Sequence, residues 1–185
     1  MENKELSTAI FAGGCFWCTE AVFRRIEGVK DVISGYIGGT IKNPCYREVC
    51  TGKTGHAEAI KIIFDETKVT FNGLLEIFFS THDPTTLNRQ GNDVGTQYRS
   101  AVFYTTQEQK DKTLAFIEML DEEKVFDNKI VTEVTEATPF YNAEENHQDY
   151  YQLNSDQPFC QLVIHPKLKK LEKYHQDKLK RANAI

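Results

Sequence analysis

The sequence contains no apolar run long enough to cross a membrane. Its longest apolar stretches, such as residues 74–75 and 77–79, fall far short of the roughly 20 residues that a membrane-spanning helix needs. Residues 1–5 carry charge and lead directly into an expected strand, without the apolar segment of an export signal. We therefore expect a cytoplasmic protein that makes no contact with membranes.

The sequence also lacks an excess of basic residues. Lysine and arginine total 22 against 27 aspartate and glutamate residues, which gives a formal net charge of −5. Nucleic-acid binding is mainly electrostatic and needs a basic face, so this balance argues against a nucleic-acid partner. The lysines near the C-terminus are those expected on the solvated face of a terminal helix.

No repeat, low-complexity tract or linker interrupts the 185 residues. We therefore predict one domain, residues 1–185, with a core at about 9–170 and a C-terminal helix that reaches 185. Strand and helix patterns are interspersed without strict alternation, which favours an α+β fold or a mixed-sheet α/β fold over an all-parallel barrel. The predicted strands are residues 8–12, 29–37, 57–64, 100–105, 130–136 and 160–164. The predicted helices are residues 15–27, 70–80, 106–124, 144–151 and the C-terminal segment, with long loops at 38–55 and 82–96.

Five cysteines occur in a chain without an export signal. Cytosolic thiols are kept reduced, so these cysteines are inert core residues, metal ligands or redox catalysts rather than a disulfide framework. They are Cys15, Cys18, Cys45, Cys50 and Cys160.

Cys15 follows two glycines at the point where a strand ends and a helix begins. The free N–H groups and partial positive charge of a helix start favour a thiolate, which is the reactive form of cysteine. Cys18 lies three residues further on, the spacing of dithiol redox motifs, and the adjacent aromatic pair Phe16 and Trp17 suits an apolar pocket. The alternative is that both cysteines are small apolar residues on a core helix.

Glu58 lies on the apolar face of the strand at residues 57–64, together with Ile60, Ile62 and Phe64. A charge on such a face is costly unless it is paired. The position therefore predicts either an ion pair with lysine or arginine, or a carboxyl whose pKa is raised so that it keeps its proton near neutrality.

The polar loop at residues 83–100 is too long and too rich in side chains for a simple connection. Within it, Asp93 and Tyr98 offer an acceptor and a phenolic donor for a small polar substrate. The alternative is a solvated loop held by its own Asn, Asp and Thr side chains.

Together these segments resemble the peptide methionine sulfoxide reductase A family. The resemblance runs from about residue 9 to residue 170 in one order. The matching segments are residues 14–17, 43–44 with Tyr46 and Val49, 54–56 with Glu58, 83–85, 90–93, 95–100, 144–150, Cys160 and 164–167.

The resemblance implies an α+β fold around a mixed sheet of the α/β-plait, or ferredoxin-like, kind. It implies thiol-dependent reduction of methionine S-sulfoxide, free or in proteins, with thioredoxin as the reductant. We also expect a monomer that uses no metal and no other cofactor. By matching position, Cys15 is the nucleophile and Glu58 protonates or polarises the sulfoxide oxygen. The matched substrate-binding residues are Tyr46, Asp93 and Tyr98 at the oxygen, Phe16 and Trp17 at the methyl group, and His147 at the wall of the site.

This chemistry agrees with the residues themselves. A sulfoxide sulfur is a poor electrophile until its oxygen takes a proton, so thiolate attack needs a nearby acid, and such acids are worth ~10²–10⁴-fold in rate. Attack leaves a sulfenic acid on Cys15, which a second thiol condenses to a disulfide, and an external dithiol then reduces this disulfide.

The sequence departs from the commonest family pattern at Cys18, where many members have glycine, and at Cys45, where threonine or serine is usual. The resolving thiol is therefore open. Cys160 is our first choice because its surroundings are similar to a resolving position in the family, and Cys18 is the alternative. Cys50 also stands where some members carry a cysteine.

Two other functions fit part of the sequence. A thioredoxin-like disulfide oxidoreductase would use Cys15 and Cys18, but this reading leaves Glu58 and the loop unexplained. A zinc module would draw on the cysteines and His56, although the spacing of Cys45 and Cys50 is wide for a zinc ribbon.

Overall fold

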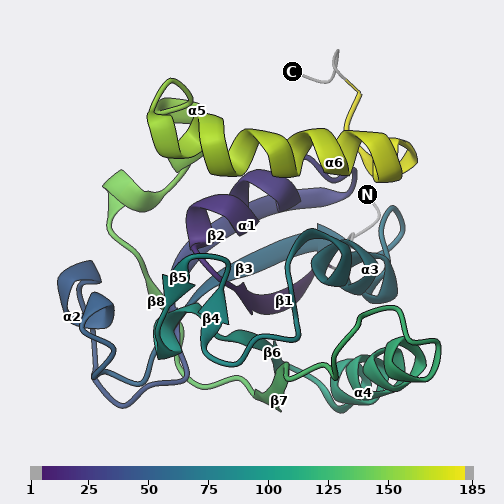
Figure 1. The fold of residues 1–185 in the computed structure, drawn as a ribbon, viewed down its shortest axis with the longest axis horizontal. Helices are drawn as coiled ribbons and strands as arrows, with labels where there is room; N and C mark the ends of the chain where they lie inside the picture. The colour runs from purple at the N-terminus through teal and green to yellow at the C-terminus, as the bar shows by residue number, and fades with distance from the viewer. Residues whose placement is uncertain (1–5, 182–185) are drawn as a thin grey trace.

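Six strands form one sheet in the order β7-β6-β1-β3-β2-β8 (Figure 1). The computed structural model describes residues 6–181. The strands are β1 (Leu6–Gly13), β2 (Val29–Ile37), β3 (Ala57–Asp65), β6 (Ser100–Tyr104), β7 (Glu133–Glu136) and β8 (Tyr141–Asn142). Neighbouring strands are antiparallel except β6 and β7, which are parallel, so the sheet is mixed.

The four central strands have the order β6-β1-β3-β2. Helix α1 (Phe16–Phe23) connects β1 to β2, and α3 (Phe71–Thr81) follows β3 and precedes β6. This succession of strand, helix, two strands, helix and strand is the split βαβ arrangement of ferredoxin-like folds. The predicted α+β fold of the α/β-plait kind is therefore confirmed.

The remaining helices are α2 (Tyr46–Cys50), α4 (Gln107–Glu122), α5 (Tyr150–Leu153) and α6 (His165–His175). Two of the longer helices begin at threonine caps: the side chain of Thr70 accepts a hydrogen bond from the Gly73 N–H, and that of Thr106 accepts one from the Gln109 N–H. Helix α4 confirms the long helix predicted at residues 106–124. Figure 1 shows α6 running past α1 across one face of the molecule, and the two helices are in contact.

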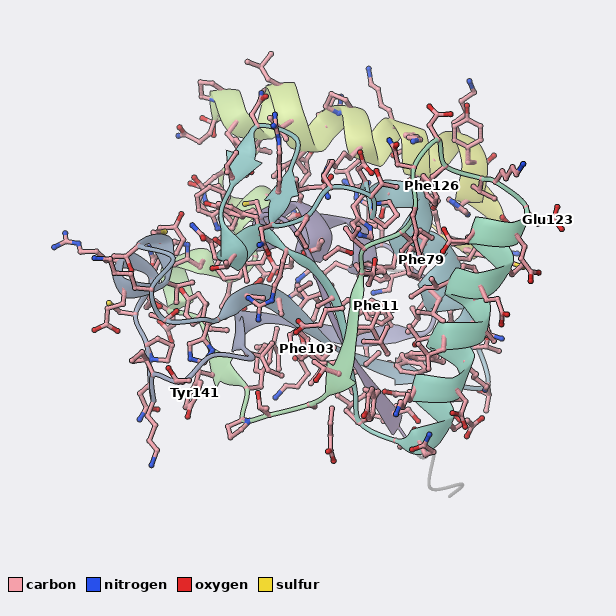
Figure 2. The ribbon with its side chains drawn as sticks, turned by 60° about the horizontal axis from the view of Figure 1, so that its bottom comes forward. Phe11, Phe79, Phe103, Glu123, Phe126 and Tyr141 are labelled. Carbon is pink, nitrogen blue, oxygen red and sulfur yellow. The ribbon has the colours of Figure 1, made fainter. Side chains whose placement is uncertain are left out.

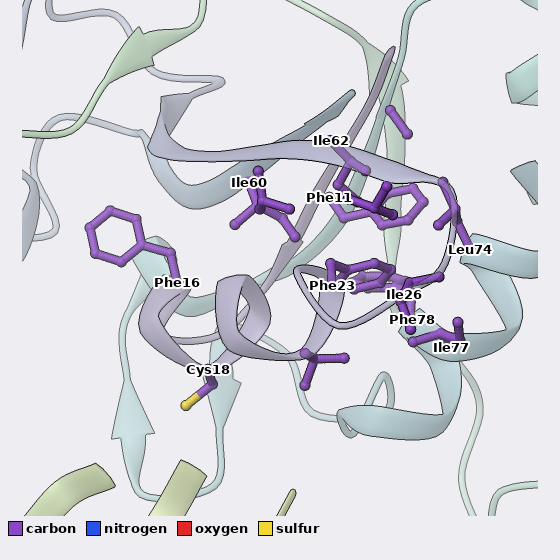
Figure 3. Packing of buried hydrophobic residues seen from close by; sticks show 14 of the residues in the cluster. Phe11, Phe16, Cys18, Phe23, Ile26, Ile60, Ile62, Leu74, Ile77 and Phe78 are labelled. Atoms are coloured by element: carbon purple, nitrogen blue, oxygen red, sulfur yellow. The ribbon is translucent and has the colours of Figure 1, made fainter. Parts of the chain in front are cut away.

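Buried apolar side chains form two clusters on opposite faces of the sheet. Phe11, Ile60 and Ile62 belong to the larger cluster, where they pack against α1 and α3 (Figure 3). Phe103 belongs to the smaller cluster on the other face. In Figure 2 both Phe11 and Phe103 lie at the sheet, whereas Glu123, just past α4, lies at the edge of the molecule.

The structure differs from the sequence-based elements in several places. The segment predicted as a strand at residues 160–164 is a π-helical stretch that continues into α6. Helix α1 ends at Phe23 rather than before Gly28, and α6 ends at His175, followed by a 3₁₀ turn, instead of reaching residue 185.

The two long loops contain structure that the sequence did not reveal. Helix α2 lies within the first loop and begins with a capping box, in which the Cys45 N–H donates to the Glu48 carboxylate at 3.0 Å. A hairpin of β4 (Arg89–Gln90) and β5 (Asp93–Val94) lies within the second.

Within residues 6–181, no helix is long and apolar enough to span a membrane. The predictions that concern residues 1–5 and the last four residues of the chain lie outside the described part of the structure.

Candidate active site

Cys15 stands between β1 and α1, at the N-cap of the helix, with its side chain partly exposed. The turn before it depends on Gly14, which has a φ of +94°. A Cβ atom at this glycine would come within 2.6 Å of the Gln90 side chain, so glycine is required both for the conformation and for the close approach of the loop. The predicted position of Cys15 at a helix start is confirmed.

Cys18 follows in the first turn of α1 and is buried. Its backbone N–H donates to the Cys15 carbonyl at 3.1 Å, and the two sulfur atoms share a hydrogen bond. The cysteine pair is therefore a hydrogen-bonded dithiol at a helix start.

The ionisation of this dithiol differs from the sequence-based expectation of a Cys15 thiolate. The hydrogen bond with Cys18 raises the pKa of Cys15 well above that of an ordinary thiol, and burial adds to this effect. The same hydrogen bond lowers the pKa of Cys18, as does the charge of Lys167. One of two such sulfurs ionises first, and the surroundings favour ionisation of Cys18 over that of Cys15.

Glu58 is the second residue of β3, and only 1% of its surface is exposed. One carboxyl oxygen accepts a hydrogen bond from the Phe16 N–H at 3.2 Å, next to the nucleophile. Burial raises the pKa of Glu58 to about 8, against the opposing effect of this hydrogen bond, and the negative charges of Asp93 and Cys18 raise it further. The carboxyl therefore holds its proton at neutral pH, as the second sequence-based alternative predicted.

Aromatic rings form a wall beside the dithiol. The Trp17 ring stacks on Tyr150 with a centroid distance of 3.7 Å and an interplanar angle of 8°. The Trp17 indole N–H donates to His147 Nδ1 at 3.2 Å, and the His147 ring lies 4.2 Å from the ring of Tyr46. Trp17 is half-buried, whereas Phe16 is fully buried.

Phe16 and Trp17, which were expected to form an apolar pocket together, have separate roles in the structure. Phe16 packs between the rings of Tyr36 and His147, each 5.7 Å away by centroid distance. Figure 3 shows Phe16 and the Cys18 sulfur pointing to different sides of α1. Phe16 therefore supports the wall from behind, and Trp17 carries the accessible surface.

Polar groups from the two long loops face the same site. Tyr46 begins α2, Asp93 belongs to β5 and Tyr98 ends a 3₁₀ turn, Thr96–Tyr98. Burial raises the pKa of Tyr46 and of Tyr98, and negative charge on Glu58 raises both further, so the two phenols remain proton donors. Burial also raises the pKa of Asp93.

Comparison with known proteins identifies the family to which this chain belongs. Residues 7–180 match the family model of peptide methionine sulfoxide reductase. The chain is 57% identical over 172 residues to a peptide methionine sulfoxide reductase MsrA of Deinococcus radiodurans, which covers 93% of this chain and 84% of the relative. The chain belongs to the peptide methionine sulfoxide reductase family. It is therefore an oxidoreductase that reduces methionine sulfoxide, as the resemblance implied.

Other members of the reductase family agree in sequence and in fold. An MsrA of Trichodesmium erythraeum is 55% identical over 174 residues, which cover 94% of this chain and 98% of that protein. The crystal structure of Mxr1 from Saccharomyces cerevisiae in reduced form has a TM-score of 0.77 at 33% identity and covers 86% of this chain and 91% of that one.

The reductase site includes residues that the sequence analysis did not single out. The Tyr36 hydroxyl donates to one oxygen of Glu144 at 3.0 Å, and the other oxygen accepts from the Tyr46 N–H at 3.2 Å. Tyr36 is paired with Glu58 across β2 and β3. Glu144 lies in a segment that matches the family, which was the only signal in the sequence that could have indicated it.

The other cysteines of the reductase lie in different surroundings. Cys160 starts the π-helical stretch, is fully buried in the larger apolar cluster and lies within electrostatic range of Cys18. Cys45 and Cys50 are exposed at the two ends of α2, and the Cys50 thiol is hydrogen-bonded to Tyr46.

The described residues of the reductase do not form the zinc site that a zinc module would need. No group of three or more His, Cys, Asp or Glu side chains between residues 6 and 181 is arranged to hold a metal ion. Both ring nitrogens of His56 are engaged with backbone groups, with the Gly39 N–H at 3.0 Å and the Ile41 carbonyl at 2.6 Å.

Proposed function

We propose that the reductase acts on methionine S-sulfoxide, free or in proteins, through attack of the Cys15 sulfur on the sulfoxide sulfur. Glu58 gives its proton to the sulfoxide oxygen in the same step. The observation that supports this proposal is the buried Glu58 carboxyl, whose pKa burial raises to about 8 and which accepts a hydrogen bond from the Phe16 N–H, next to Cys15. A sulfoxide bound there meets an acid and a sulfur nucleophile together.

The proton on Cys15 has an acceptor at hand. Cys18 shares a hydrogen bond with Cys15 and has the lower pKa of the two, and transfer of the Cys15 proton along this hydrogen bond to an ionised Cys18 leaves the negative charge on Cys15. The Cys15 thiolate, the Glu58 proton and the sulfoxide then yield methionine and a sulfenic acid on Cys15. The oxygen passes from the substrate to the Cys15 sulfur, and Glu58 is left as a carboxylate.

Trp17 is placed to hold the methyl group of the substrate. Tyr150 covers one face of its ring, and the partly exposed remainder of the ring faces the site. Tyr46 and Tyr98 supply phenolic donors for the sulfoxide oxygen, Asp93 shapes the polar side of the site, and Phe16 and His147 fix the wall behind.

Cys18 is the better resolving thiol on geometric grounds. It already shares a hydrogen bond with Cys15, and after proton transfer it is a thiol that can condense with the sulfenic acid, releasing water. Cys160, our first choice from the sequence, is fully buried and belongs to an apolar cluster. Cys160 can follow as a second exchange partner of the Cys15–Cys18 disulfide.

The external reductant in this proposal is a thioredoxin, which attacks the disulfide with its own dithiol. A crystal structure also exists of the S. cerevisiae protein Mxr1 in complex with Trx2, and the matched chain is 23% identical in sequence to this one.

Kinetics with the two separated epimers of a methyl sulfoxide test the proposal. We expect turnover of the S epimer with thioredoxin as reductant, no turnover of the R epimer, and loss of S-epimer turnover in Cys15→Ser. Equal rates with both epimers would contradict the proposed specificity, and an active Cys15→Ser variant would refute the assigned nucleophile.

A disulfide oxidoreductase remains a second candidate, since a hydrogen-bonded dithiol at a helix start also suits thiol–disulfide exchange. Reduction of insulin disulfides by this protein distinguishes the two. Rapid insulin reduction without sulfoxide reduction would favour the second candidate.

Intact-mass analysis after a single turnover without reductant tests the choice of resolving thiol. We expect a Cys15–Cys18 disulfide in the wild type and in Cys160→Ser, and a stable sulfenic acid in Cys18→Ser. A disulfide that is lost in Cys160→Ser and retained in Cys18→Ser would restore Cys160 as the resolving residue.

A further inference from the structure

Glu20 is a buried carboxylate on α1 that the proposed chemistry does not use. Only 1% of its surface is exposed. Such burial of a carboxyl is costly unless its oxygens have partners, and Glu20 has three. One oxygen accepts from the Tyr150 N–H at 3.2 Å, the other accepts from the Ser34 hydroxyl at 3.1 Å, and the Arg24 guanidinium lies at 3.9 Å.

These contacts hold the start of α5 against α1. Asp149, which precedes Tyr150, has a φ of +51°, a left-handed conformation that is uncommon for residues other than glycine. The Arg24 guanidinium lies 2.8 Å from the Asp149 carboxylate. Glu20 in α1 and Arg24 at the C-cap of α1 therefore hold the backbone of Tyr150 and the side chain of Asp149, the N-cap residue of α5.

The ring of Tyr150 covers one face of the Trp17 ring. The backbone of Tyr150 is held by Glu20 and its ring stacks on Trp17 at 3.7 Å. Trp17 belongs to the same helix as Glu20, three residues earlier, so the two contacts close a small loop of interactions. The orientation of the Trp17 ring therefore depends on where Glu20 holds Tyr150.

Ser34 connects the same carboxylate to the segment before α5. Its backbone N–H donates to the Gln148 side-chain oxygen at 2.9 Å, and its carbonyl accepts from the Gln148 amide at 2.8 Å. His147, which accepts from the Trp17 indole, directly precedes Gln148. Two partners of the Trp17 ring, Tyr150 and His147, are thus attached to the Glu20–Ser34 pair.

We propose that Glu20 is a positioning residue that sets the orientation of Trp17 through Tyr150 and so determines how tightly methyl sulfoxides bind. This inference rests on the proposed function, in which Trp17 contacts the methyl group. Glu20 does not touch the reacting atoms. Its loss is expected to weaken substrate binding and to leave the chemistry at Cys15 largely intact.

The test compares Glu20→Ala, Glu20→Gln and Glu172→Ala. We expect Glu20→Ala to raise KM for a methyl sulfoxide by about two- to tenfold, the size expected for one lost aromatic contact, with kcat within about twofold. Glu20→Gln should behave like the wild type, because its amide oxygen can still accept from the Tyr150 N–H and its amide can donate to Ser34. Glu172→Ala removes a carboxylate from an exposed ion pair with Arg25 and serves as the control.

Fluorescence gives a readout that does not need turnover. The protein contains one tryptophan, so its emission reports on Trp17 alone. Glu20→Ala should shift and change this emission toward that of a Tyr150→Ala variant, while Glu20→Gln and Glu172→Ala keep the wild-type spectrum. If Glu20→Ala fails to fold, Glu20→Asp, whose shorter side chain withdraws the carboxylate from the Tyr150 N–H, takes its place in each comparison.

The combined variant Glu20→Ala/Tyr150→Ala decides the route of the effect. If Glu20 acts through Tyr150, its removal has no further effect on KM once the tyrosine is gone. Fully additive effects, or an unchanged KM and spectrum in Glu20→Ala, would overturn the proposal. A wild-type protein that reduces no methyl sulfoxide would instead contradict the proposed function. In that case the fluorescence spectra would still test whether Glu20 sets the orientation of Trp17.

Discussion

Glu58→Gln is predicted to stabilise the protein while it slows the reaction, and the gain in stability is predicted to grow with pH. The folded protein holds the Glu58 proton up to a pKa of about 8, against an ordinary value of 4.5. Because the unfolded chain releases this proton first, the ionised form favours unfolding as pH rises from 4.5 toward 8. The contribution of the Glu58 side chain to the free energy of unfolding is therefore fully present below pH 4.5 and is lost as the pH rises through about 8.

The magnitude follows from the two pKa values. Each pH unit between them corresponds to about 1.4 kcal/mol, so that the cost at pH 7 is about 3 kcal/mol and at pH 9 about 5 kcal/mol. Glutamine does not ionise, and its amide oxygen can still accept the hydrogen bond from the Phe16 N–H. Glu58→Gln should therefore match the wild type near pH 4.5 and exceed its stability by these amounts at higher pH.

Urea unfolding at pH 5, 7 and 9, with reductant present, measures the effect. Glu118→Gln, an exposed glutamate on α4, is the matched control and should show no such trend. In parallel, the single-turnover rate of Glu58→Gln at pH 7 should fall by ~10²–10⁴-fold, because the amide cannot act as an acid. A stability difference that does not change between pH 5 and pH 9 would mean that Glu58 is already ionised in the folded protein, and the acid role would be lost with it.

Further variants test other parts of the structure. Trp17→Ala should raise KM for methyl sulfoxides about tenfold or more with a smaller change in kcat, and an unchanged KM in steady-state kinetics would place Trp17 outside the binding site. Gly14→Ala should lower both stability and activity, because the backbone there has a φ of +94° and the new Cβ meets Gln90; urea unfolding and turnover measure this. Thr106→Ala removes an N-cap and should cost about 1 kcal/mol in urea unfolding with activity unchanged, so a loss of turnover would show that α4 matters to the site.

The sequence predicts those features that depend on local periodicity or on a single capping residue. Strand β2 has the predicted bounds, and the alternation in β3 correctly places Glu58 on the face that carries Ile60 and Ile62. The cap at Thr106 follows from residue type and position alone. In each case the determining interaction lies within a few residues along the chain.

The features that the sequence could not supply depend on tertiary contacts or on competition between local preferences. Residues 160–164 contain β-branched and apolar side chains that suit a strand, but Cys160 and Ile164 are buried as part of a helix that packs against α1. The lowered pKa of Cys18 depends on a hydrogen bond between two side chains, for which spacing alone gives no sign of ionisation. The contact between Glu20 and Tyr150 joins residues 130 positions apart.

Glu58, the proposed catalytic acid, and Glu20, the proposed positioning residue, are buried to the same extent on neighbouring elements but have different partners. Glu58 has one backbone partner and one oxygen that is buried without a hydrogen bond among the described residues, which favours the neutral acid. Burial also raises the pKa of Glu20, which is as deeply buried, but the Arg24 guanidinium and two hydrogen-bond donors oppose this effect. The number of partners, together with the depth of burial, therefore distinguishes the carboxyl proposed to give a proton to the substrate from the one proposed to hold the wall of the site.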